Sequence, residues 1–171
     1  MNDKNITLIG MPGAGKSTVG IVLAKILGME FLDSDLLIQK REKKLLWQII
    51  EEQGLDGFDR VEEDVNCSIE TENTIIATGG SAVYSEKAMR HFQEIGTVVY
   101  LKVSCEELKK RLGDLKNRGV SIKEGQTLED LYEERRPLYE KYADITVDLE
   151  ETDVRQAAEL IAAEGTRGNG I

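Results

Sequence analysis

Short apolar runs alternate along the chain with longer stretches of helical periodicity. The runs are rich in β-branched side chains, as buried strands are, and they span residues 6–9, 30–32, 74–78, 97–101 and 144–147. Apolar positions recur at helical spacing in residues 16–27, 36–72 and 128–142 and again from Val154 onward, with a predicted break near Gly54 and Gly57. Strands that alternate with helices need crossover connections. The pattern therefore predicts an α/β fold with a mostly parallel sheet, helices on both faces and ligands at the carboxyl ends of the strands.

The length and composition predict one compact enzyme domain. The chain has 171 residues, 40% of them hydrophobic, which suffices for a single core. We expect the domain to span residues 1–164 and the polar, glycine-rich residues 165–171 to form a flexible tail, because they have nothing to bury. A formal charge of −10 disfavours nucleic acid as a partner, and no apolar run is long enough to cross a membrane. The start of the chain lacks the apolar core of a signal peptide, so we expect a cytoplasmic protein, and a monomer.

The cysteines and the single histidine do not predict a metal site. Cys67 and Cys105 lie far apart in the sequence, and His91 has no second histidine near it. We expect both cysteines to be structural and His91 to lie partly exposed on a helix.

The segment from Gly10 to Ser17, GMPGAGKS, matches the phosphate-binding pattern G-x-x-x-x-G-K-[ST]. It follows a predicted strand and precedes a predicted helix, as the mechanism requires. Glycines let the backbone turn its N–H groups toward an anion, and the helix start adds a positive dipole end. Lys16 adds a full charge on what we expect to be an exposed loop, and Ser17 offers a hydroxyl to Mg²⁺. The expected nucleotide-binding residues are Gly13, Ala14, Gly15, Lys16, Ser17 and Thr18.

Further polar residues fall at the ends of predicted strands. The acidic turn with Asp33 and Asp35 follows the second strand, and Gly79 and Gly80 follow the third. The polar stretch 113–125, which contains three glycines, predicts a mobile lid.

Several segments in this order resemble the shikimate kinases, small P-loop enzymes that transfer the γ-phosphate of ATP to a hydroxyl of shikimate. The resemblance covers about 150 residues, and it depends on GMPGAGKS, LDSD at 32–35, FDRVEE at 58–63, TGG at 78–80, NR at 117–118 and RRPLY at 135–139. It implies a three-layer fold with a five-stranded parallel sheet, ATP and Mg²⁺ as cofactors, a closing lid, an acceptor-binding region at 36–62 and a role in amino-acid biosynthesis.

The resemblance also implies roles for individual residues. Asp33 would help to hold Mg²⁺, and Asp35 would orient or deprotonate the acceptor hydroxyl, whereas a simpler interpretation is that the acidic turn only caps the next helix. Gly79 and Gly80 would let the backbone approach the acceptor, or would form an ordinary turn.

Three arginines are implied as ligands. Arg118 would reach the transferring phosphate from the lid, and Arg111 would lie against adenine, although both could instead lie on a solvated face. Arg135 would bind the carboxylate of the acceptor, with the adjacent Arg136 as the alternative.

One departure from the family pattern concerns the acceptor. The shikimate kinases have Phe-Arg-x-x-Glu where this chain has Phe58 and then Asp59, so an arginine expected to bind the substrate carboxylate is replaced by an acid. Arg60 is rotated by about 100° around a helix and cannot simply substitute. Either Asp59 faces an ammonium group of a different acceptor, or it faces solvent and another arginine binds the carboxylate. Smaller departures are Ser81 in place of a third glycine and Gly119 in place of a proline.

Three functions therefore stay open at this stage. Shikimate is the acceptor implied by the overall likeness, and a hydroxy amino acid such as homoserine is the alternative implied by Asp59. A non-catalytic nucleotide-binding module would be expected to lose Lys16, Ser17 or the aspartates, and this chain keeps all of them. The RRPLY segment argues against nucleoside monophosphate and gluconate kinases.

Overall fold

A computed structural model describes residues 4–112 and 120–167 of the chain. Within them, five parallel strands form one sheet in the order β2-β3-β1-β4-β5. The strands are β1 (Asn5–Ile9), β2 (Glu30–Asp33), β3 (Thr74–Ala77), β4 (Gly96–Lys102) and β5 (Ile145–Asp148). β1 is central, with Leu8 in register with Ala77 on one side and Val99 on the other. The predicted five-stranded parallel sheet is confirmed.

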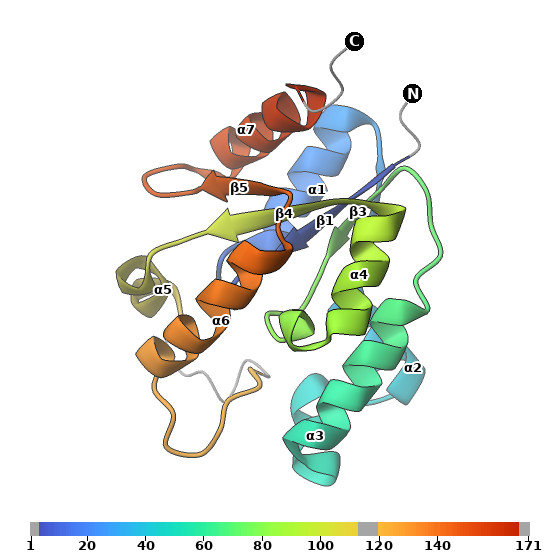
Figure 1. The fold of residues 1–171 in the computed structure, drawn as a ribbon, viewed down its shortest axis with the longest axis vertical. Coiled ribbons are helices and arrows are strands. Elements are labelled where there is room, and N and C mark those ends of the chain that lie inside the picture. Colours follow the sequence, from blue (N-terminus) through green and yellow to red (C-terminus); the bar gives the residue numbers. More distant parts are fainter. Residues whose placement is uncertain (1–3, 113–119, 168–171) are drawn as a thin grey trace.

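Helices cover both faces of this sheet (Figure 1). α1 (Lys16–Leu27) and α7 (Val154–Arg167) pack together on one face, while α4 (Glu86–Ile95) and α6 (Leu128–Tyr142) contact β4 on the other. Because both faces are covered, the central strands are apolar on both sides, as β3 shows with four buried residues. α1 and α6 have the predicted bounds, whereas α7 continues to Arg167, past the predicted end of the domain at residue 164.

The remaining helices lie toward the carboxyl ends of the strands. α2 (Ser34–Glu42) and α3 (Leu46–Cys67) form a hairpin with a small core of Ile38, Ile49, Phe58 and Val65, and η1 (Ala82–Tyr84) and α5 (Cys105–Arg111) are short. The predicted break occurs at Gly54, which has φ 72° and ψ 178° and kinks α3. Gly57 does not interrupt the helix, because it has helical geometry there and is buried.

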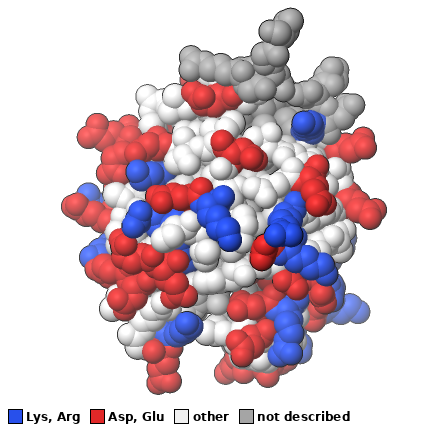
Figure 2. Space-filling model, viewed as in Figure 1, with Lys and Arg blue, Asp and Glu red and all other residues white. Residues whose placement is uncertain are grey.

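The two cysteines are unpaired, and the histidine contacts the backbone. Cys67 and Cys105 are free thiols, and a ring nitrogen of His91 lies 2.8 Å from the carbonyl oxygen of Ile69. Within the described residues no group of three or more acidic, histidine or cysteine side chains could hold a metal ion, and no helix is long and apolar enough to cross a membrane. On the face shown in Figure 2, basic side chains lie interspersed with acidic ones and form no continuous patch.

Candidate active site

The P-loop connects β1 to α1 and is shaped by its glycines. Gly13 and Gly15 have φ values of 81° and 93°, a left-handed conformation that other residues rarely adopt. A side chain at Gly13 would also lie 2.9 Å from the side chain of Leu112, at the end of α5. The loop thus depends both on its own glycines and on a segment far away in the sequence.

Lys16 is buried, which contradicts the expectation of an exposed loop lysine. Its side-chain ammonium donates hydrogen bonds to the carbonyl oxygens of Gly10 at 2.7 Å and Met11 at 2.8 Å. Burial lowers the pKa of Lys16 to about 8, against the opposing effect of the Asp35 carboxylate. The lysine therefore holds the loop through its backbone.

Ser17 and Asp33 come together although they lie on different elements. The Ser17 hydroxyl donates to Oδ2 of Asp33 at 2.6 Å, while Oδ1 of Asp33 accepts from the backbone N–H groups of Asp35 and Leu36. Asp33 therefore caps α2, as the simpler interpretation held, and also faces the P-loop. A serine hydroxyl beside a carboxylate is an oxygen-donor pair of the kind that Mg²⁺ prefers, so these two residues fit the expected metal.

Asp35 is the second residue of α2 and lines the same cavity as Lys16. Burial, followed by the neighbouring Asp33 carboxylate, raises the pKa of Asp35 to about 6. The side chain is therefore mostly ionised at neutral pH, yet basic enough to accept a proton from a hydroxyl.

Gly79 and Gly80 sit where side chains would collide with the site. A Cβ atom at Gly79 would lie 2.7 Å from Oε2 of Glu62 and 2.8 Å from Oδ1 of Asp35. One at Gly80 would lie 2.7 Å from Pro12 and 3.0 Å from a guanidinium nitrogen of Arg135. The glycine pair therefore lets two carboxylates, the P-loop and an arginine approach one backbone segment.

Arg135 is the arginine that faces the cavity. It is 1% exposed, its Nε donates to the Tyr84 hydroxyl at 3.1 Å, and its Nη2 donates to the carbonyl oxygen of Ser121 at 2.6 Å. Tyr139, one helical turn later, donates to the carbonyl oxygen of Gly80 at 2.6 Å and so fixes the loop after β3. Arg136 points to the surface, where it pairs with glutamates of its own helix at 3.2 and 3.3 Å.

These side chains share one cavity of about 440 Å³. Its lining includes Lys16, Ser17, Thr18, Asp35, Phe58, Gly79, Gly80 and Arg135. Four of the predicted residues that the structure describes are not part of the lining, namely Ala14, Asp33, Asp59 and Arg111. Ala14 is buried, with its N–H donated to the Met11 carbonyl oxygen, and Asp59 lines a separate, smaller cavity instead.

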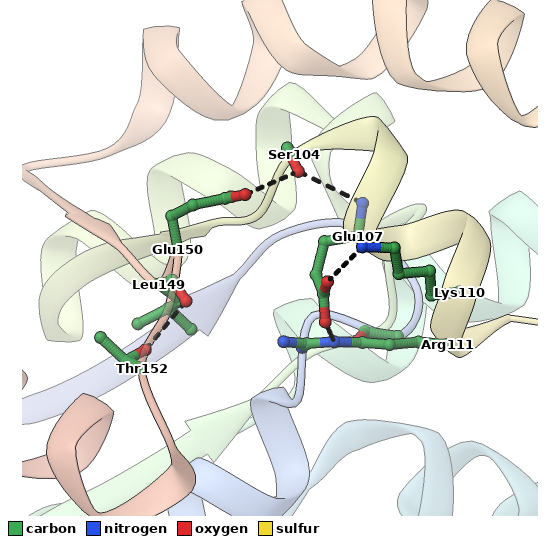
Figure 3. Close-up of polar contacts among 8 residues, drawn as sticks. Ser104, Glu107, Lys110, Arg111, Leu149, Glu150 and Thr152 are labelled. Atoms are coloured by element: carbon green, nitrogen blue, oxygen red, sulfur yellow. Dashed lines mark hydrogen bonds and ion pairs between the residues drawn. The ribbon is translucent and has the colours of Figure 1, made fainter.

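Arg111, the last residue of α5, contacts the backbone of the P-loop. Its Nε donates to Glu107 at 3.0 Å and its Nη1 to the carbonyl oxygen of Gly13 at 3.4 Å, and Figure 3 shows it beside Glu107 on the same helix. The start of α5 is connected to the segment after β5, because the Ser104 hydroxyl donates to Glu150 at 3.3 Å (Figure 3). Arg111 thus adjoins the phosphate loop. Arg118 and most of the predicted lid lie outside the described residues.

The roles of Glu62 and Ser81, beside the acceptor end of the cavity, were not predicted from the sequence. Glu62 is 3% exposed, and its Oε1 accepts a hydrogen bond from the Ser81 hydroxyl at 2.7 Å. Burial raises the pKa of Glu62 to about 8, so the side chain is mostly neutral at pH 7. A signal was present, because Ser81 replaces the glycine usual in the resembling family.

The comparisons with known proteins agree with this geometry. The sequence model of the family described as shikimate kinase matches residues 12–164. The chain belongs to the shikimate kinase family. Enzymes of this family are ATP-dependent phosphotransferases that act on an alcohol group.

Individual shikimate kinases align over nearly their whole length. Shikimate kinase 1 of Sodalis glossinidius is 38% identical over 162 residues, which cover 92% of this chain and 94% of the relative. The structure of shikimate kinase from Acinetobacter baumannii in complex with shikimate superposes with a TM-score of 0.88 at 34% identity, covering 97% of this chain and 94% of the other. The shikimate kinase of Aquifex aeolicus gives a TM-score of 0.79 at 32% identity, with 97% and 99% coverage.

Proposed function

We propose that this chain transfers the γ-phosphate of ATP to a hydroxyl of shikimate. The observation that carries the proposal is the single cavity in which a phosphate-binding loop, the carboxylate of Asp35 and the guanidinium of Arg135 face one another. Such a cavity presents an anion site for nucleotide phosphates, a base for a hydroxyl and a cation for a carboxylate. The match to an enzyme solved with shikimate supports this choice of acceptor.

Separate residues bind the phosphates, bind the acceptor and accept the proton. The backbone N–H groups of the P-loop and Lys16 bind the phosphates, and Lys16 exchanges its bonds to two carbonyl oxygens for bonds to phosphate. Arg135 binds the acceptor carboxylate with its remaining donors, and Asp35 orients the hydroxyl and accepts its proton as the oxygen bonds to phosphorus.

Ser17 and Asp33 would hold Mg²⁺. The ion supplies neutralisation of the charge on the nucleotide phosphates when it is bound. The hydrogen bond between the two side chains supports this assignment, because it holds two oxygen donors at the mouth of the P-loop.

Three further assignments complete the proposal. Arg111 lies along the adenine of ATP. Residues 36–62 bind the acceptor, which is supported by Phe58 and Leu46 in the cavity wall. The whole unit forms one kinase domain.

A coupled assay of ADP release tests the proposal, with ATP, Mg²⁺ and shikimate present together and each omitted in turn. We expect ADP release to depend on all three and the phosphorylated product to appear in ³¹P NMR spectra. ADP release that does not change when the acceptor is omitted, or no release with any hydroxylated carboxylate, would contradict the proposal.

A further inference from the structure

A second, smaller cavity adjoins the acceptor end of the active site. It measures about 150 Å³ and is lined by Asp59, Arg60, Glu62, Glu63, Ser81, Tyr84 and Ser85. Ser81 also lines the main cavity. Tyr84, which lines this side cavity, also contacts Arg135, because its ring centroid lies 5.1 Å from the guanidinium carbon. The side cavity therefore adjoins the arginine proposed to bind the acceptor carboxylate.

The side cavity contains carboxylate oxygens without partners. Glu62 is almost fully buried, yet its Oε2 has no hydrogen-bond partner, and the buried Oδ1 of Asp59 has none either. By contrast, the third acid, Glu63, accepts a hydrogen bond from the Ser85 hydroxyl. Buried acceptors of this kind are costly unless a donor reaches them, and an ammonium group offers three donors and the opposite charge.

No basic side chain in the described part of the chain pairs with Asp59 or Glu62. Arg60 is exposed and donates its Nε to the backbone carbonyl oxygen of Asp56 at 3.3 Å. Arg135 donates to Tyr84 and Ser121 and lines the main cavity. Against the larger effect of burial, the charge of Arg135 lowers the pKa of both Asp59 and Glu62, but no hydrogen bond joins either nearby arginine to the two unpartnered oxygens.

We propose that the side cavity binds an ammonium group of the acceptor while Arg135 binds its carboxylate. This inference rests on the proposed phosphoryl transfer and extends its acceptors to α-amino acids with a side-chain hydroxyl. Three substrate groups then meet four complementary residues: the carboxylate meets Arg135, the ammonium meets Asp59 and Glu62, and the hydroxyl meets Asp35. The hydroxyl oxygen bonds to the γ-phosphorus, the bond from that phosphorus to the β–γ bridging oxygen breaks, ADP leaves with the electron pair, and the hydroxyl proton passes to Asp35.

Burial supports the same assignment. It raises the pKa of both Asp59 and Glu62, which shows that the cavity disfavours unpaired negative charge. A bound ammonium reverses this effect, because an opposite charge nearby favours the ionised carboxylate.

The test compares acceptors that differ only in the amino group. L-homoserine and 4-hydroxybutanoate share a carboxylate and a terminal hydroxyl, and only the first carries an ammonium. We expect the native chain to phosphorylate L-homoserine with a kcat/KM at least about 30-fold higher than 4-hydroxybutanoate, the low end of what a desolvated charge pair contributes. Similar values for the two compounds would overturn the inference.

Two variants test whether Asp59 causes the preference for L-homoserine. Asp59→Asn keeps the shape of the side chain, and we expect it to abolish most of the preference for L-homoserine over 4-hydroxybutanoate. Asp64→Asn is the matched control, because it removes one exposed acid from the same helix outside the acceptor-binding region and should keep the preference. Circular dichroism verifies that both variants fold. An unchanged preference in Asp59→Asn would overturn the assignment.

The outcomes separate this inference from the proposed function. Turnover of shikimate without any phosphorylation of L-homoserine refutes the cation site and leaves the kinase activity standing. Absence of turnover with every acceptor refutes the proposed function itself.

Discussion

Replacing Glu62 by glutamine should make the stability of the protein less dependent on pH. The folded chain holds Glu62 neutral up to about pH 8, whereas the unfolded chain ionises it near its ordinary pKa of 4.5. The folded pKa is raised, so the contribution of Glu62 to stability is intact below about pH 4.5 and is lost as the pH rises through about 8. Glutamine has the same shape, keeps an oxygen for the Ser81 hydroxyl and does not ionise.

The magnitude follows from the two pKa values. The full loss amounts to about 5 kcal/mol, at about 1.4 kcal/mol for each tenfold change in proton affinity. When the pH is raised from about 5.5 to about 8.5, the free energy of unfolding of Glu62→Gln should therefore increase by about 3 kcal/mol relative to that of the native chain. Contributions from titrating groups that do not interact with Glu62 are common to both proteins and cancel in the comparison.

Urea unfolding followed by far-UV circular dichroism at the two pH values measures this difference. Glu94→Gln, an exposed glutamate on α4, is the control and should behave as the native chain does at both pH values. If the difference between Glu62→Gln and the native chain is the same at both pH values, Glu62 is ionised in the folded protein and the reasoning fails.

Three further predictions concern the active site. Lys16→Ala should lower kcat/KM at least about 100-fold, because the transferring phosphate loses a fixed positive charge, and urea unfolding of the variant should remain cooperative; near-native turnover would contradict the assignment. Asp35→Asn should lower kcat about 100-fold or more while the affinity for ATP measured by calorimetry changes less than about threefold, and the native rate should fall below about pH 6 as the base becomes protonated. An equal loss of ATP affinity would show that Asp35 does not act on the acceptor. Gly80→Ala should raise the KM for the acceptor about 10-fold by displacing Arg135. Gly165→Ala is the control and should leave the KM unchanged, because the nearest atom to the added Cβ would lie 4.0 Å away. Equal kinetics in the two variants would contradict the prediction.

Local signals in the sequence were sufficient for the fold class and the phosphate loop. Strand and helix periodicity depends on neighbouring residues, so α1 and α6 were predicted to the residue and all five strands to within one or two residues. GMPGAGKS is contiguous, so the anion-binding loop could be recognised from neighbouring residues alone. The roles of Asp33 and Arg135 came from resemblance, because nothing local distinguishes a ligand from a helix cap or a surface arginine.

Packing between distant segments decided the rest. Adjacent arginines on α6 differ in direction by about 100°, and only the position of the helix against the loop after β3 shows that Arg135 is enclosed and Arg136 exposed. The burial of Lys16 and Glu62 likewise depends on which surfaces cover them. A pKa in a protein is set by desolvation and by charges from other elements, so the sequence named the ionisable residues and the tertiary structure determined which of them are neutral, which are charged and which face the substrate.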